Sequence, residues 1–316
     1  MIGAGPASRI FGALVAARDR GYRDGRLGVA RLPAPVVSVG NLSVGGSGKT
    51  PAVIALGRAL RASGLRVDVL SRGYHRASRR LEIARDGRED VAAVGDEPRL
   101  IAARLQAPVL VHPDRFRAGL AGERQFHTQL HLLDDGFQHR QLARALDLVL
   151  VSPADLADRL LPAGRLREPP AALARAGAVL WTGAGDGGIA ALAAFTAAPV
   201  FAARKRPLPP APGWPRHPLA FCGLARPESF WATLKELGIA PAARVAFRDH
   251  HRFSGRDLAR LRRTADAAGA DGFLTTAKDA MRLPDGLTPP PAVVEIELHI
   301  PALEKLIALI RKACGV

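Results

Sequence analysis

The chain has 316 residues, with 45 Lys and Arg against 29 Asp and Glu, a formal net charge of +16 at pH 7 and 48% hydrophobic residues. This composition excludes a mainly disordered chain, and the length favours two domains that are each large enough to bury a core. Cys222 and Cys314 lie far apart, which excludes a disulfide scaffold and a cysteine-rich zinc site and fits a reducing compartment. No apolar run approaches the ~20 residues that span a bilayer.

The excess of basic residues is spread along the chain and forms no basic tail. It favours attraction to something anionic, which could be nucleic acid, acidic lipid or a phosphorylated substrate. Arginine makes up most of this excess, so the role of each of the few lysines is considered separately. The lysines are Lys49, Lys205, Lys235, Lys278, Lys305 and Lys312.

The first predicted element is a short amphipathic helix around the apolar residues 10–17, which arginines flank. Helical spacing places Ile10, Leu14 and Ala17 on one face. That face could lie in a membrane surface while the arginines contact anionic head groups, or it could pack on the protein's own domain. A signal peptide is a third possibility, which the cytosolic nucleotide chemistry predicted below disfavours.

From residue 35, short Val- and Leu-rich runs alternate with longer stretches of helical period, a pattern typical of βαβ units and a parallel sheet. A proline-rich segment, residues 206–218, interrupts this alternation and is predicted to be a linker. We therefore predict an α/β fold with a nucleotide-binding domain over residues 1–203 and a second, smaller α/β domain over residues 204–316. The predicted strands are Val36–Val39, Val67–Leu70, Val109–Val111, Leu130–Leu133, Leu148–Val151, Val179–Trp181, Leu219–Cys222, Arg244–Phe247, Gly272–Thr275 and Val293–Glu297.

The strongest motif is a glycine-rich loop, VGNLSVGGSGKTP over residues 39–51, between a predicted strand and a helix that runs to about Ala62. In a P-loop of the kinase type, glycines turn backbone N–H groups toward phosphate oxygens, and the helix N-terminus adds its positive dipole end. Lys49 would contact the β- and γ-phosphates and Thr50 would ligate Mg²⁺. The predicted nucleotide-binding residues are Ser43, Val44, Gly45, Gly46, Ser47, Gly48, Lys49 and Thr50.

One position of this loop departs from the pattern GxxxxGK(S/T), because Ser43 stands where the pattern has glycine. The alternative is a glycine-rich turn without function. The coincidence of strand, loop, scarce lysine and helix disfavours that alternative.

A second motif, Asp134-Asp135-Gly136, ends a predicted hydrophobic strand. It could supply the carboxylate that a P-loop enzyme delivers to Mg²⁺ from a neighbouring strand. The same residue types also form ordinary turns, and only the P-loop favours the metal role.

Two smaller clusters contain acidic and histidine side chains. Asp96 lies at a loop-to-helix junction, where it could merely cap the helix. Asp249, His250 and His251 follow a predicted strand and could form a solvated loop or a stray metal site. A carboxylate paired with a histidine could instead form a general base for a hydroxyl nucleophile, provided that both face the γ-phosphate.

Together these segments resemble the tetraacyldisaccharide 4′-kinase family, the lipid A 4′-kinases of Gram-negative bacteria. The family's loop commonly carries the serine found at position 43, and Ala277 stands where the family has glutamate, which puts only the role of that residue in doubt. The matching segments run in order over nearly the whole chain, at residues 40–51, 71–74, 95–98, 134–139, 166–169, 220–223, 249–250 and 275–279.

The resemblance implies ATP- and Mg²⁺-dependent phosphorylation of the 4′-hydroxyl of a tetraacyl glucosamine disaccharide 1-phosphate, a lipid A precursor. It implies a location at the cytoplasmic face of the bacterial inner membrane, which favours the interfacial role of the first helix on an anionic surface. No obligate protein partner is evident.

The resemblance also implies roles for single residues. It assigns Lys49 to catalysis and the nucleotide, and it assigns Asp96 and His250 to activation of the sugar hydroxyl. Thr50, Asp134 and Asp135 would be the metal ligands. Residues of other matching motifs would line the substrate cleft, namely Arg72, Gln138, Arg167 and Glu168.

The main alternative is a basic P-loop ATPase or GTPase that acts on nucleic acid. GTP is disfavoured because Lys278-Asp279 lacks the spacing of the guanine-recognition motif (N/T)KxD. Nucleic acid is disfavoured because aromatic residues make up only 5% of the chain and do not interleave with basic residues for base stacking. A non-catalytic nucleotide-binding module is disfavoured by the intact lysine and carboxylates.

Overall fold

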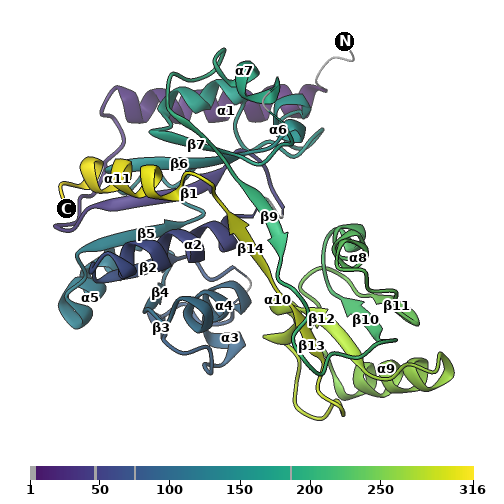
Figure 1. Ribbon diagram of the computed structural model, residues 1–316. Helices are drawn as coiled ribbons and strands as arrows, with labels where there is room; N and C mark the ends of the chain where they lie inside the picture. The colour runs from purple at the N-terminus through teal and green to yellow at the C-terminus, as the bar shows by residue number, and fades with distance from the viewer. Residues whose placement is uncertain (1–4, 46–47, 75, 186) are drawn as a thin grey trace.

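The computed structural model describes residues 5–45, 48–74, 76–185 and 187–316, and the chain forms two sheets joined by a two-stranded ladder (Figure 1). The larger sheet has the strand order β3-β4-β2-β5-β1-β6-β7-β8 and is parallel except for the edge pair β3–β4. Its strands are β1 (Val36–Asn41), β2 (Val67–Ser71), β3 (Glu82–Ala84), β4 (Val109–Val111), β5 (Leu130–Asp134), β6 (Leu146–Val151), β7 (Ala178–Trp181) and β8 (Val200–Ala202).

The smaller sheet is parallel throughout, in the order β11-β10-β12-β13. An antiparallel ladder of β9 and β14 runs between the two sheets (Figure 1). These strands are β9 (Arg204–Pro207), β10 (Leu219–Cys222), β11 (Ala243–Ala246), β12 (Phe273–Thr276), β13 (Ala292–Val294) and β14 (Ile296–His299).

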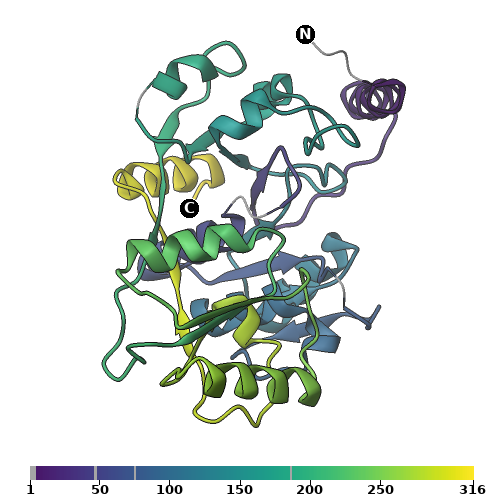
Figure 2. The same cartoon turned by 90° about the vertical axis from the view of Figure 1, so that its right-hand side faces the viewer.

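Helices cover both faces of each sheet, and we call each sheet with its helices the larger and the smaller unit. In the smaller unit, α8 and α9 lie on opposite faces (Figure 2). The helices are α1 (Pro6–Arg23), α2 (Lys49–Ala62), α3 (Val91–Val94), α4 (Asp96–Leu105), α5 (Arg115–Phe126), α6 (Pro153–Ala157), the 3₁₀ helix η1 (Pro170–Arg175), α7 (Gly187–Leu192), α8 (Pro227–Glu236), α9 (Gly255–Ala267), α10 (Ala277–Ala280) and α11 (Leu303–Cys314).

The central strands are apolar on both sides because both faces of the larger sheet are buried. Neighbouring residues of a strand point to opposite faces. Leu132 of β5 packs in the core with α2, α4 and α11, and the next residue, Leu133, packs in the core with α5. The predicted α/β fold with a P-loop sheet and a second, smaller sheet is therefore confirmed.

The predicted strands correspond to observed strands with one informative exception. The predicted strand over residues 293–297 is divided at Glu295, because β13 pairs with β12 in the smaller sheet whereas β14 pairs with β9 in the ladder. The predicted linker of residues 206–218 begins inside β9.

Helix α11 packs against the larger sheet although it is the last element of the chain. Leu306 and Ile310 are fully buried in the core that α2, β1 and β6 share. The division into residues 1–203 and 204–316 stays a prediction, and we propose that α11 be counted with the larger unit.

Helix α1 lies at the edge of the larger unit, where Figure 2 shows it end-on. Ser8 Oγ donates to the Leu160 carbonyl at 3.1 Å, and Arg140 donates to Asp19 Oδ1 at 2.9 Å. One face of α1 is thereby attached to its own domain. None of the helices within the described ranges combines the length and apolar character that a membrane crossing requires.

A buried ionic cluster ties β2, β5 and α5 together. His131 Nδ1 lies 2.6 Å from Asp68 Oδ1 and Nε2 lies 3.3 Å from Glu123 Oε1, while Thr128 donates to Asp68 Oδ2 at 2.8 Å. Burial raises the pKa of the Asp68 carboxyl. Burial alone would lower the pKa of His131, but the contacts with Asp68 and Glu123 outweigh it and raise that pKa.

The Asp68–His131 pair holds protons more tightly in the folded than in the unfolded chain. Its contribution to stability is therefore largest at low pH, and it is lost as pH rises above the ordinary carboxyl pKa of 3.8 and through the raised pKa of His131, above 6.5. We predict that the melting temperature falls less between about pH 6 and about pH 9 in Asp68→Asn/His131→Gln than in the wild type. Equal slopes in thermal melts followed by circular dichroism would contradict this assignment.

Candidate active site

Two of the predicted motifs leave the larger sheet at the same edge. β1 pairs with β5 in parallel, and the register sets Val39 beside Asp134. The glycine-rich loop after β1 and the acidic pair after β5 therefore emerge side by side. The carboxyl ends of the strands are where open α/β sheets bind their ligands.

The glycine-rich loop leads from β1 into α2 and is braced by a second segment. Gly45 and Gly48 have φ of 107° and 98°, which residues with a β-carbon rarely adopt. The Val44 N–H donates to the Arg165 carbonyl at 2.8 Å, and the Arg167 N–H donates to the Leu42 carbonyl at 2.7 Å. Ser43 and Leu166 form an isolated antiparallel β-bridge between the same two segments. The predicted Gly46 and Ser47 lie outside the described residues.

The charged groups around this loop converge on Asn41, which is fully buried at the end of β1. Lys49 Nζ donates to Asn41 Oδ1 at 3.0 Å, and the Arg167 guanidinium donates to the same oxygen. Asn41 Nδ2 donates to the Ser43 carbonyl at 2.8 Å, and the Asn41 carbonyl accepts from Gln138 at 3.0 Å. No role for Asn41 was predicted from the sequence, although a polar residue that ends an apolar strand directly before the loop indicates a site residue.

Asp135 balances the two cations that meet at Asn41. Arg167 donates to both carboxylate oxygens, at 2.9 and 2.7 Å, and Lys49 Nζ lies 3.5 Å from Asp135 Oδ1. Burial works to raise the pKa of Asp135, but Lys49 and Arg167 outweigh it and lower the pKa to about 2. The carboxylate is therefore ionised at neutral pH and holds the lysine near the loop.

Asp134 lies deeper than its neighbour, with 4% of its surface exposed, and accepts from Ser71 Oγ at 3.2 Å. Burial, followed by the negative charges of Glu97 and Asp135, raises the pKa of Asp134 to about 7. A carboxylate whose ionised form is disfavoured in this way is a favourable neighbour for a cation.

These donors fit Mg²⁺ bound together with phosphate. Within the described ranges, no cluster of three or more His, Cys, Asp or Glu side chains could hold a metal alone. Mg²⁺ commonly takes one or two carboxylates and completes its shell with water and substrate phosphates. Thr50 at the start of α2, with Asp134 and Asp135, offers a donor set of that kind.

Asp96 and His250 meet across the two units. Asp96 is the first residue of α4, and His250 lies after β11; the distance from His250 Nδ1 to Asp96 Oδ2 is 3.0 Å. Gly95 occupies the cap position of α4, and Asp96 Oδ1 accepts from the Glu97 N–H of the first turn at 3.0 Å, while Oδ2 faces His250. His250 adopts a φ of 54°, an uncommon conformation for a non-glycine residue, in the loop that aims its ring at Asp96.

Cations of the smaller unit surround Asp96. Lys278 Nζ lies 3.9 Å and Arg282 Nε 3.7 Å from Asp96 Oδ2. Burial works to raise the pKa of Asp96, but His250 and Lys278 outweigh it and lower the pKa. Lys278 also donates to Glu97 at 2.9 Å and lies 3.3 Å from His250 Nε2. Lys278 therefore belongs to the contact between the units.

His251, the neighbour of His250, is directed elsewhere. Its ring stacks on Phe247 with centroids 4.6 Å apart, and its Nε2 lies 3.2 Å from Asp257. Both partners belong to the smaller unit, so His250, and not its neighbour His251, is the histidine that pairs with Asp96.

The predicted cleft residues occupy different depths. Arg72 is exposed and lines a cavity of about 270 Å³ with Tyr74, whose ring meets that of His250 edge-on at 6.0 Å. Glu168 is fully buried and pairs with Arg175 at 2.6 Å and with Arg18 of α1 at 3.5 Å. The role of Glu168 toward substrate stays a prediction, and its contacts favour an action through these arginines.

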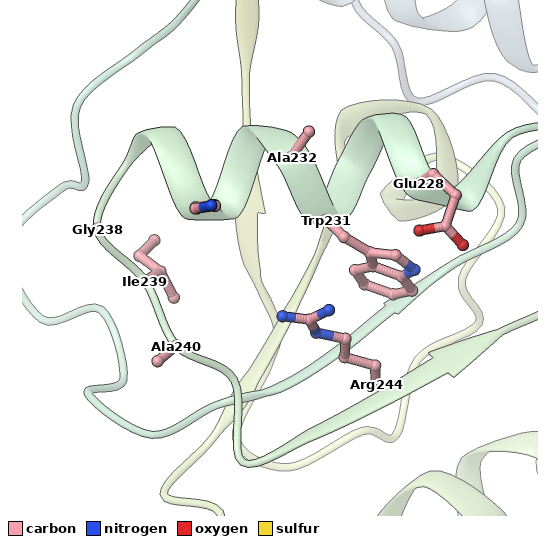
Figure 3. Close-up of a pocket in the computed structure, with 8 residues that line it drawn as sticks. Glu228, Trp231, Ala232, Gly238, Ile239, Ala240 and Arg244 are labelled. Carbon is pink, nitrogen blue, oxygen red and sulfur yellow. The ribbon is translucent and has the colours of Figure 1, made fainter.

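A larger cavity, of about 520 Å³, lies in the smaller unit between α8 and β11 (Figure 3). There the Arg244 guanidinium lies 5.7 Å from the centre of the Trp231 ring. None of the predicted site residues lines this cavity. Its size therefore does not make it the catalytic site.

Comparison with known proteins gives a consistent match. A family model described as Tetraacyldisaccharide-1-P 4′-kinase matches residues 4–314. A Tetraacyldisaccharide 4′-kinase of Koribacter versatilis is 44% identical over 289 residues, which cover 88% of this chain and 88% of the relative. The protein of that name from Geobacter metallireducens is 39% identical over 86% of each chain.

A solved structure agrees with these relatives. The crystal structure described as the "apo" form of LpxK from Aquifex aeolicus in complex with ATP has a TM-score of 0.81 to this chain. The two chains are 33% identical, and the match covers 98% of each.

We predict that Asn41→Ala lowers kcat/KM for ATP by roughly 10- to 100-fold, because Lys49 and Arg167 each lose a buried acceptor. Steady-state kinetics with varied ATP would measure this loss. Ser38→Ala is the matched control, since Ser38 is buried on the same strand and its hydroxyl has no hydrogen-bond partner among the described residues. Equal losses in both variants would show that any polar-to-alanine change in β1 has this effect.

Proposed function

This chain belongs to the tetraacyldisaccharide-1-P 4′-kinase family, and we infer from its structure which residues perform each part of the phosphoryl transfer. The protein is a phosphotransferase that moves the γ-phosphate of ATP to the 4′-hydroxyl of a tetraacyl glucosamine disaccharide 1-phosphate, a step of lipid A biosynthesis. The assignment of roles to the site residues rests mainly on the 3.0 Å contact of His250 with Asp96 across the two units.

The glycine-rich loop and Lys49 would bind the phosphates of ATP. Phosphoryl transfer needs little covalent help and much neutralisation of charge, so pre-positioned cations lower the barrier most. Asn41 and Asp135 fix the Lys49 ammonium, and Arg167 is fixed by the same two groups. Mg²⁺, held by Thr50, Asp134 and Asp135, would supply further charge neutralisation at the phosphate oxygens.

Asp96 and His250 would activate the 4′-hydroxyl. The Asp96 carboxylate accepts from Nδ1, which orients the ring and stabilises the positive charge that the ring gains when Nε2 takes the hydroxyl proton. Nε2 lies 3.3 Å from Lys278 Nζ, so the acceptor hydroxyl would replace that contact. A positioned base of this kind contributes ~10²–10⁴-fold to the rate.

Transfer of labelled phosphate from ATP to a lipid A disaccharide precursor, in detergent with Mg²⁺, tests these roles. We predict that Asp96→Asn and His250→Gln each lower kcat by ~10²–10⁴-fold and that the double variant is little worse than the more severe single one, because the pair acts as a unit. His251→Gln is the matched control and should retain activity. Small losses that multiply in the double variant would argue against a coupled pair.

We further propose that α1 holds the enzyme on an anionic membrane surface, at the cytoplasmic face of the bacterial inner membrane. Ile10 and Leu14 are 63% and 64% exposed, and Ala13 and Ala17 are exposed on the same helical face. Exposed arginines at both ends of the helix suit acidic head groups. The opposite face is attached to the larger unit through Ser8 and other residues, so α1 can face lipid without leaving the protein.

We predict that Ile10→Ser/Leu14→Ser weakens sedimentation with vesicles of phosphatidylglycerol and phosphatidylethanolamine by roughly 10-fold or more, because two large apolar side chains no longer enter the lipid. Leu27→Ser/Val29→Ser is the control, since both residues are exposed apolar side chains outside the helix. Unchanged partitioning of the helix variant into vesicles would indicate that α1 has only a structural role.

A further inference from the structure

Lys205 approaches the phosphate loop from a different part of the chain. It lies on β9, where it pairs in register with Leu298 of β14. A β-carbon added to Gly48 would lie 2.8 Å from Lys205 Cε and 3.7 Å from its Nζ. The end of the Lys205 side chain therefore lies against the turn that opens α2, next to Lys49.

The two lysines form part of a local excess of positive charge. The surrounding protein, followed by the charge of Lys49, lowers the pKa of Lys205. Asp135 already accepts from Arg167 and lies 3.5 Å from Lys49. Asp135 thus contacts two cations, and the Lys205 ammonium adds a positive charge beside the same loop. A polyanion bound at the loop would relieve the repulsion between the ammonium groups.

The neighbours of Lys205 on the strand do not share this position. Alternate side chains of a strand point to opposite faces, so Arg204 and Arg206 are directed away from the face that carries Lys205. Both are exposed. In a chain whose basic residues are mostly arginine, the side chain directed at the loop is one of the few lysines. A compact ammonium on a flexible stem suits a point contact with a phosphate.

We propose that Lys205 is a further phosphate-binding residue of this kinase, which contacts the phosphate chain of ATP from the ladder strand β9. The proposal rests on the assignment of the turn at residues 48–50 as the phosphate site. It adds a ligand from the strand that joins the two units to those that the loop itself supplies.

Binding of ATP, ADP and AMP to the full-length protein, measured by calorimetry, tests the proposal. Lys205→Met should weaken binding of ATP and ADP by about 10-fold, the effect of roughly 1.4 kcal/mol, and leave AMP within about twofold. Lys205→Arg should recover most of the ATP affinity because it restores the charge. Arg206→Met removes one charge from the same strand on the opposite face and should change ATP affinity by less than about twofold. Lys205→Gln repeats the test with a polar side chain.

Three results would overturn the proposal. They are unchanged ATP affinity in Lys205→Met and Lys205→Gln, equal weakening of ATP and AMP binding in Lys205→Met, and equal weakening of ATP binding by Arg206→Met. Lys49→Met, measured in parallel, distinguishes two kinds of failure. If Lys49→Met weakens ATP binding and Lys205→Met does not, only the role of Lys205 is refuted; if neither does, the assignment of the phosphate site fails as well.

Discussion

The main-chain register between β1 and β5 sets where the phosphate loop and the acidic pair lie relative to each other. In this register Val39 lies beside Asp134, so the end of β1 and the acidic pair reach the sheet edge at the same level. A shift of one residue would turn each β5 side chain to the opposite face and direct Asp134 away from Ser71. The apolar residues of both strands resist such a shift because each face has its own core.

At the end of β1, the neutral side chain of Asn41 orients the charged groups around it. Asn41 accepts from Lys49 and Arg167 without adding a charge, while Asp135 supplies the balancing negative charge from the next strand. An aspartate in place of Asn41 would compete with Asp135 for the same cations. The amide therefore orients the cations and leaves a net positive field, which an anionic ligand can use.

Much of this could be predicted from the sequence. Parallel strands that are buried on both faces leave long apolar runs, and the loop and acidic motifs follow such runs directly. The pairing of Asp96 with His250 was implied by the family resemblance, whereas the residue types alone left it open. The structure brings them within 3.0 Å, while their role in the reaction stays a proposal.

Other features leave no local signal in the sequence. β9 consists largely of basic residues and is exposed over most of its length, so it lacks the apolar pattern of a buried strand. An amphipathic pattern shows that α11 has an apolar face, but it cannot show which of two sheets receives that face. The place of Lys205 follows from both of these non-local facts, since it depends on where β9 runs.

The ladder also determines how the two units are connected. The chain enters the smaller unit after Pro207 and leaves it before Ile296, and these two residues are paired directly across the ladder. The smaller unit is thus a domain insertion, and the larger unit is discontinuous in sequence but continuous in space. A truncation near residue 203 would remove α11 and expose the core around Leu306, whereas a short turn in place of residues 208–295 would keep both ladder strands and that core intact.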